Sequence, residues 1–180
     1  RFLVQHDGYH VHTADIHSVA TVAELAGLQA GLAEGPEPVL TGLMREVERP
    51  ELLFLAALLH DIGKGGQGDN ERHEICGARL ARGVGERMGL PEADVSVLAK
   101  LVELHLVLSE AAQRSDLGDE DFLRQLAARI PPGLLKLLYL LTYADSRATG
   151  PASWTAWRSA LIQELFFKLQ AVLERPAGEA

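Results

Sequence analysis

The chain has 180 residues, 47% of them hydrophobic and 23% charged, which is the composition of a globular domain that buries a core without disulfides. Cys76 is its only cysteine, so an intrachain disulfide is excluded and a reducing, cytoplasmic location is favoured. The formal net charge of -8 argues against nucleic acid as a partner, and no apolar run reaches the ~18 residues of a membrane span. Because the first residue is Arg1 and not methionine, we expect a single domain over residues 1–180 that is a piece of a longer protein.

Helix start signals recur along the whole chain. Each is a capping or first-turn residue type, and they fall at Asp15, Pro50–Glu51, Asn70, Pro91–Glu92, Asp119 and Ser153. Apolar residues follow them at three- and four-residue steps, whereas no run alternates convincingly with a period of two. We therefore predict an all-α fold, a compact bundle of six to eight helices, with linkers at 35–38, 65–69 and 150–151.

Four polar residues stand where the helical periodicity requires core residues. His60 and its neighbour Asp61 end one apolar stripe, and His105 and Asp145 each follow a leucine of their own stripe by seven residues. A buried ionised aspartate is costly unless it is paired or binds a metal, and imidazole is the commonest metal ligand. A single histidine on an apolar face is more often a hydrogen-bonded core residue, so spacing alone leaves both interpretations open. With His17 from the first helix, the set predicts a metal site between helices.

The order of these residues resembles a known family. His17, then His60-Asp61, then Asp145 is similar to the pattern of the HD superfamily of metal-dependent phosphohydrolases. The stretches YHVHTADIHS (9–18), FLAALLHDIGKG (54–65), HEICGARLA (73–81), LVELHLVLSEAAQRSDL (101–117) and LLYLLTYADSRATGPASWTAW (137–157) resemble the HD domain of bifunctional protein-PII uridylyltransferase/uridylyl-removing enzymes. The resemblance covers nearly the whole chain. One departure is the loop from Lys64 to His73, which is longer than usual and places Asn70 where a shorter loop would place the histidine.

The resemblance implies a division of labour within a longer enzyme. In that family a nucleotidyltransferase domain attaches UMP to a tyrosine of the nitrogen-signalling protein PII, the HD domain is associated with its removal, and C-terminal ACT domains sense glutamine. The chain carries no nucleotidyltransferase signature and no room for ACT domains, so the resemblance implies only the hydrolytic half. The expected substrate is then uridylylated PII and the expected product is UMP.

The same resemblance assigns roles to individual residues. His17, His60, Asp61 and Asp145 would hold a metal ion, while His73 and His105 would hold a second ion bridged by Asp61, or contact phosphate. Asp61 and Lys64 would be catalytic, with Lys64 on the phosphoryl group, and Arg114 and Arg147 are secondary phosphate candidates whose alternative is a surface salt bridge. An imidazole-rich site without thiolate suits one or two ions of Mn, Fe, Co, Ni or Zn better than Mg.

Two other functions stay open. One is an HD-type phosphohydrolase acting on a free nucleotide, which calls for aromatic rings to stack the base, and only 6% of the chain is aromatic. The other is a non-catalytic metal-binding regulatory module, which the presence of all four ligands His17, His60, Asp61 and Asp145 disfavours.

Overall fold

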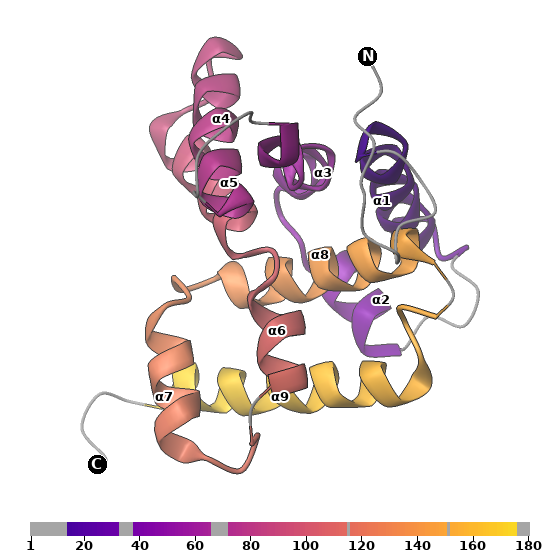
Figure 1. The fold of residues 1–180 in the computed structure, drawn as a ribbon, viewed down its shortest axis with the longest axis vertical. Coiled ribbons are helices and arrows are strands. Elements are labelled where there is room, and N and C mark those ends of the chain that lie inside the picture. Colours follow the sequence, from indigo (N-terminus) through magenta and orange to yellow (C-terminus); the bar gives the residue numbers. More distant parts are fainter. Residues whose placement is uncertain (1–13, 33–37, 66–71, 115, 151, 176–180) are drawn as a thin grey trace.

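The structure, a computed structural model, describes residues 14–32, 38–65, 72–114, 116–150 and 152–175, and every regular element in these ranges is a helix (Figure 1). The elements are α1 (Ala14–Gln29), α2 (Pro38–Arg45), α3 (Pro50–Leu59), the 3₁₀-helix η1 (Ile62–Gly65), α4 (His73–Arg87), α5 (Glu92–Leu104), α6 (Val107–Arg114), α7 (Glu120–Ala128), α8 (Leu134–Thr149) and α9 (Ala156–Glu174). The all-α prediction is confirmed. The described ranges hold nine α-helices against the six to eight expected, and the eight-residue helices α2 and α6 account for the difference. None of the helices described is long and apolar enough to cross a membrane.

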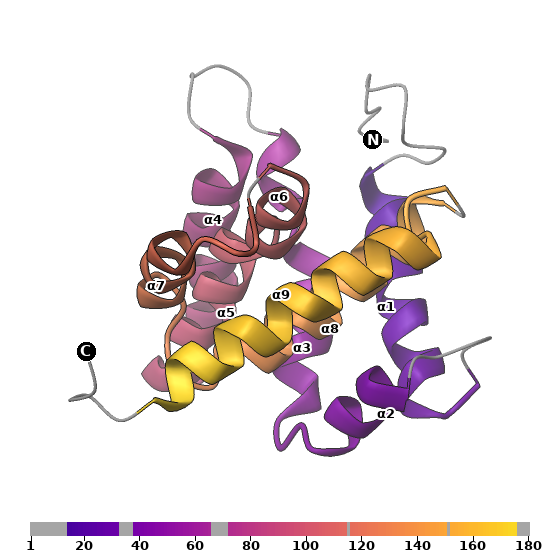
Figure 2. The ribbon, with the colours of Figure 1, turned by 90° about the horizontal axis from the view of Figure 1, so that it is seen from below.

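Helix α8 is the centre of the fold. Figure 1 shows it crossing the middle of the molecule, and α1, α2, α3, α5, α6 and α9 all contact it. Leu138, Tyr139, Leu140 and Leu141 each expose 0% of their surface, so the helix is buried around its whole circumference. Figure 2 shows α9 passing across α8, where the ring of Tyr139 stacks on that of Phe166 at 4.7 Å. The helix that carries Asp145 is thus held from all sides.

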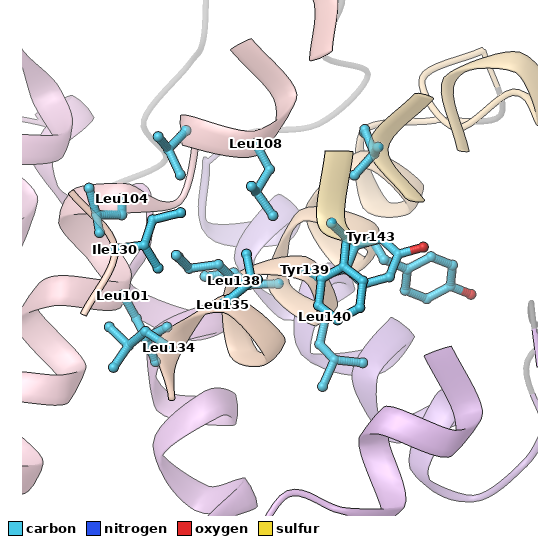
Figure 3. Close-up of a cluster of buried hydrophobic side chains, with 14 of the residues drawn as sticks. Leu101, Leu104, Leu108, Ile130, Leu134, Leu135, Leu138, Tyr139, Leu140 and Tyr143 are labelled. Carbon is cyan, nitrogen blue, oxygen red and sulfur yellow. The ribbon is translucent and has the colours of Figure 1, made fainter. Parts of the chain in front are cut away.

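The leucines of α8 also join it to α5 and α6. Figure 3 shows Leu134, Leu135 and Leu138 in one cluster with Leu101 and Leu104 of α5 and Leu108 of α6. Burying such side chains contributes roughly 1.5–3 kcal/mol each before the loss of conformational entropy. This cluster fixes the end of α5, where His105 lies, relative to Asp145 on α8.

The helix starts agree with the sequence signals at several points. Asp119 caps α7, its carboxylate accepting hydrogen bonds from the backbone N–H of Asp121 and Phe122. The predicted start signal of α9 was Ser153, but the cap lies two residues later at Thr155, whose hydroxyl accepts a hydrogen bond from the backbone N–H of Arg158. Asn70 lies outside the described residues.

Gly63 lets η1 lie directly on the first turn of α4. A Cβ added at Gly63 would lie 1.9 Å from the carbonyl oxygen of His73 and 2.7 Å from the backbone nitrogen of Gly77, and no side chain fits there. The close backbone approach places Lys64 and His73 beside the end of α3.

Gly63→Ala should therefore destabilise the domain by about 2 kcal/mol or more, since two backbone segments must separate to admit one methyl group. Gly83→Ala is the matched control: its Cβ would meet only the flexible end of Arg87 at 3.4 Å, so this helical position should lose nothing and gain up to about 1 kcal/mol. Urea unfolding of both variants measures the difference. Equal unfolding free energies would contradict the close approach.

Candidate metal centre

Two histidines end two helices in the same way. His60 is the C-cap of α3 and His105 is the C-cap of α5. The Nδ1–H of His60 donates to the carbonyl of Ala57 at 2.8 Å, and that of His105 donates to the carbonyl of Val102 at 2.7 Å. Because this bond fixes a proton on Nδ1, each Nε2 points to the interior, where it can bind a metal ion once it carries no proton of its own. Both side chains are buried, with 0% and 2% of the residue exposed.

The first cluster joins three helices. His17 Nε2 from α1 lies 2.8 Å from Asp145 Oδ1 of α8 and 3.2 Å from His60 Nε2, and His60 Nε2 lies 3.5 Å from the same Asp145 oxygen. These separations suit donors that share one ion, because ligands with ~2.1 Å bonds lie no more than about 4 Å apart. The imidazole rings of His17 and His60 meet edge to face rather than stacking, so their nitrogens can face a common point.

Asp61 lies between this cluster and a second one. Its Oδ2 is 3.8 Å from His17 Nε2 and 3.5 Å from His60 Nε2. Its Oδ1 is 3.9 Å from His73 Nε2 and 3.8 Å from His105 Nε2. One carboxylate therefore presents one oxygen to each cluster, which is the position of a bridging ligand.

The chemistry of these donors fits a divalent cation. The ligand atoms of His17, His60 and Asp145 lie within 4.8 Å of one another, and so do those of Asp61, His73 and His105. Nε2 of His73 and Nε2 of His105 are buried and have no hydrogen-bond partner among the described residues. Buried lone pairs that face a carboxylate oxygen are unfavourable unless a positive charge lies between them. The residues present thus satisfy the requirement of one or two metal ions for nitrogen and oxygen ligands.

The carboxylates of the centre are held in their charged form. Burial favours the neutral acid of Asp145, but hydrogen bonds from His17 and His60 outweigh it and keep its pKa well below the ordinary value. Burial also favours the neutral acid of Asp61. The charges of His60 and Lys64 outweigh burial there and lower the pKa of Asp61 below its ordinary value. Lys64 Nζ donates to Asp61 Oδ2 at 2.8 Å. Both aspartates are therefore anionic at neutral pH.

The histidines are divided between the two charge states. Burial disfavours the His60 imidazolium, but the hydrogen bond and charge of Asp145, with the charge of Asp61, raise the pKa of His60 to about 9. Burial and the charge of His60 lower the pKa of His105 to about 4, and burial also lowers the pKa of His73. Without metal, a proton on His60 supplies the positive charge that the centre needs, while His105 is neutral.

A cavity of about 500 Å³ opens beside the centre. The volume falls in the range of ~300–1,000 Å³ typical of ligand sites. Asp61, Lys64, His73 and Asp145 form its wall on the metal side. The other lining residues come from α6, α8, the first turn of α9 and the connections before α6 and α9, and they are Leu106, Ser109, Gln113, Ser146, Thr149, Ser153 and Arg158.

Neither of the two secondary phosphate candidates, Arg114 and Arg147, is placed in the cavity wall by the described part of the structure. Arg147 Nε is 3.4 Å from Glu24 Oε2 and does not line the cavity. Arg114 ends α6, and its side chain is outside the described part of the structure, as is the loop 66–71. Arg158 was missed in the sequence, because nothing local in the chain shows that the first turn of α9 lines the same cavity as Asp61 and Lys64.

Asp61→Ala should abolish metal binding at the primary site, because it removes an oxygen from both clusters at once. His73→Ala and His105→Ala should spare that site, since their nitrogens face only Asp61 Oδ1. Asp116→Ala, which removes an exposed carboxylate that accepts from Gly118, is the control. Calorimetric titration of Mn²⁺ gives the stoichiometry and affinity of each. Unchanged values for Asp61→Ala would exclude it as a ligand.

Metal binding should displace one proton at pH 7, because the raised pKa of His60, about 9, leaves its imidazole charged in the metal-free protein. Affinity should rise ~10-fold per pH unit between pH 7 and 8, as one competing proton is lost, and level off above about 9. His105 adds nothing to this slope, because its pKa near 4 leaves it neutral throughout. Titrations in buffers of different ionisation enthalpy count the protons, and a count of zero would contradict the assignment.

Comparison with known proteins agrees with this geometry. The HD domain family matches residues 15–147. Proteins named bifunctional uridylyltransferase/uridylyl-removing enzyme are 42% identical in Streptomyces coelicolor and 39% identical in Caulobacter vibrioides (strain NA1000), each over 176 residues and 97% of the chain. The same-named protein of Pseudomonas putida (strain W619) is 39% identical over 173 residues and 96% of the chain.

These alignments cover 19%, 18% and 19% of the relatives respectively, so the chain spans about a fifth of the length of the curated relatives it matches. The family match contains the positions of His17, His60, Asp61 and Asp145. These residues converge from α1, α8 and the end of α3. The resemblance seen in the motifs is confirmed, and the chain belongs to the HD domain family of metal-dependent phosphohydrolases.

Proposed function

We propose that this domain hydrolyses the phosphodiester between UMP and a tyrosine of PII, the uridylyl-removing half of a two-way modifying enzyme. The observation that carries the proposal is the convergence of six residues with nitrogen and oxygen donors, Asp61 among them, at the wall of an open cavity. The relatives' name, which includes a uridylyl-removing activity, supplies the chemical group removed. The nucleotidyltransferase and glutamine-sensing domains would lie in other parts of a longer, cytoplasmic protein.

The proposed residue roles follow from the distances. His17, His60, Asp145 and Asp61 would hold one ion, and His73 and His105 with Asp61 would hold a second or contact the phosphate. A bound ion of Mn, Fe, Co, Ni or Zn would lower the pKa of a water nucleophile and withdraw charge from a phosphoryl oxygen. Lys64, bonded to Asp61 at the cavity wall, adds a positive charge where the phosphoryl group enters. The leaving phenol has a pKa near ~10, so it needs little help from an acid.

The cavity walls favour a protein-borne substrate over a free nucleotide. The described residues that line the cavity include no phenylalanine, tyrosine or tryptophan, and the one ring among them is the imidazole of His73, a candidate metal ligand, so a base has no free ring there to stack on. A tyrosine on a protein surface brings its own binding area, and recognition then needs only the phosphoryl group in the cavity. Hydrolysis of free nucleotides is the second candidate, and a regulatory module that only binds metal is the third.

With Mn²⁺ and uridylylated PII, the protein should release UMP, and Lys64→Ala should lower that rate ~10² to 10³-fold, the usual effect of losing one donor that stabilises a transition state. Metal stoichiometry should not change, because Lys64 carries no ligand atom. Lys100→Ala is the control, since Lys100 pairs with Glu103 on α5 and does not line the cavity.

The assay follows UMP release from modified PII and from free nucleoside triphosphates, with and without metal. Hydrolysis confined to free nucleotides would favour the second candidate. A metal-loaded protein that hydrolyses neither would favour the third, provided that the full-length enzyme is also inactive.

A further inference from the structure

Arg158 is a cation of the cavity wall without a protein partner in the described structure. It lies in the first turn of α9, a helix that contributes none of the six metal-facing ligands. Its Nε is buried and has no hydrogen-bond acceptor among the described residues, and its guanidinium forms no ion pair with a described carboxylate. A buried donor of this kind needs an acceptor from solvent or from a ligand.

Other cations near the centre are already paired. Lys64 Nζ donates to Asp61 Oδ2 at 2.8 Å, and Arg147 Nε lies 3.4 Å from Glu24 Oε2. The carboxylates of the wall are matched as well, since Asp61 is bonded to Lys64 and Asp145 accepts from His17 at 2.8 Å. The charge of Arg158 is therefore the positive charge of the cavity that no described side chain neutralises.

The surroundings of Arg158 suit an anion with several oxygens. Ser146 of α8 and Ser153 of the α8–α9 connection line the cavity with it, and both bring hydroxyl groups. Guanidinium presents a planar fork of N–H donors that matches two oxygens of a phosphoryl group, and it keeps its charge at every relevant pH. A carboxylate-lined metal site needs such a cation on the ligand side, because a phosphodiester brings negative charge toward Asp61 and Asp145.

We propose that Arg158 is a positioning residue that binds the phosphoryl oxygens of the substrate, and that it makes the cavity selective for phosphorylated over uncharged ligands. The identity of the substrate rests on the function proposed above, whereas the anion site itself rests on the cavity and on the unpaired guanidinium. Arg158 binds the phosphoryl group from α9 and Lys64 binds it from η1, beside the residues that would hold the metal ion.

The test is direct binding of three probes to the Mn²⁺-loaded protein by calorimetry: UMP, orthophosphate and uridine. Arg158→Met should weaken the binding of UMP and of orthophosphate by the same factor, at least 10-fold, because the lost contact is to the phosphoryl group that both ligands carry. Uridine binding should not change. Arg158→Lys should recover part of the loss, and Arg124→Met, which removes an exposed arginine paired with Asp121 and Glu120, should match the wild type.

A merely structural role is separated by two further readouts. The thermal midpoint and the Mn²⁺ stoichiometry of Arg158→Met should equal those of the wild type, since the Arg158 side chain has no partner to lose in the described structure and is not a candidate metal ligand. UMP and orthophosphate affinities within twofold of the wild type, or a wild type that binds neither, would overturn the inference.

The proposed function can fail separately. If Arg158→Met loses phosphate binding while the wild-type enzyme releases no UMP from PII, the anion site stands and the uridylyl-removing function falls. If the wild type releases UMP, and Arg158→Met binds phosphate and releases UMP equally well, the uridylyl-removing function stands and the anion site falls.

Discussion

The rest of the site depends on one buried carboxylate. Asp61 exposes 4% of its surface, and its two oxygens face two different groups of histidines. An anion in such a place is tolerated only with positive charge close by, and here that charge comes from Lys64 and from His60 or a metal. The elements that carry the candidate ligands must therefore pack around Asp61, so a single side chain constrains the packing of five helices, α1, α3, α4, α5 and α8.

The scaffold meets this constraint with helix ends rather than helix faces. His60 and His105 are both C-caps whose Nδ1–H satisfies a carbonyl of the last turn, which is one of the groups a helix end leaves without a partner. The same bond fixes the tautomer and aims Nε2 at the metal side, so capping and ligand orientation are one interaction. Asp145 is different, because it projects from the side of α8, and the complete burial of residues 138–141 keeps that helix from turning.

The metal-free centre is electrostatically balanced by protonation. A proton on His60 offsets Asp145 and Asp61, while the two histidines nearest Asp61 Oδ1 have their pKa values lowered and stay neutral. The two clusters thus differ in protonation. The cluster of His17, His60 and Asp145 holds a proton that a metal ion must displace, whereas the cluster of Asp61, His73 and His105 has neutral imidazoles that can bind an ion without losing a proton. This asymmetry gives a physical reason for two ions, if both bind, to differ in affinity and in pH dependence.

The sequence by itself determined the helical fold, the residue types of the centre and the helices or helix ends that carry them, because apolar periodicity and capping residues are local signals. His17, His60, Asp61, His73, His105 and Asp145 could all be named in advance, with the family resemblance supplying their roles. Tertiary structure alone decided which oxygen of Asp61 faces which group of histidines, and that Arg158 borders the cavity while Arg147 pairs with Glu24. The reason is distance along the chain: Arg158 is 97 residues from Asp61, and only the packing of α9 across the largely buried α8 brings the two to one cavity.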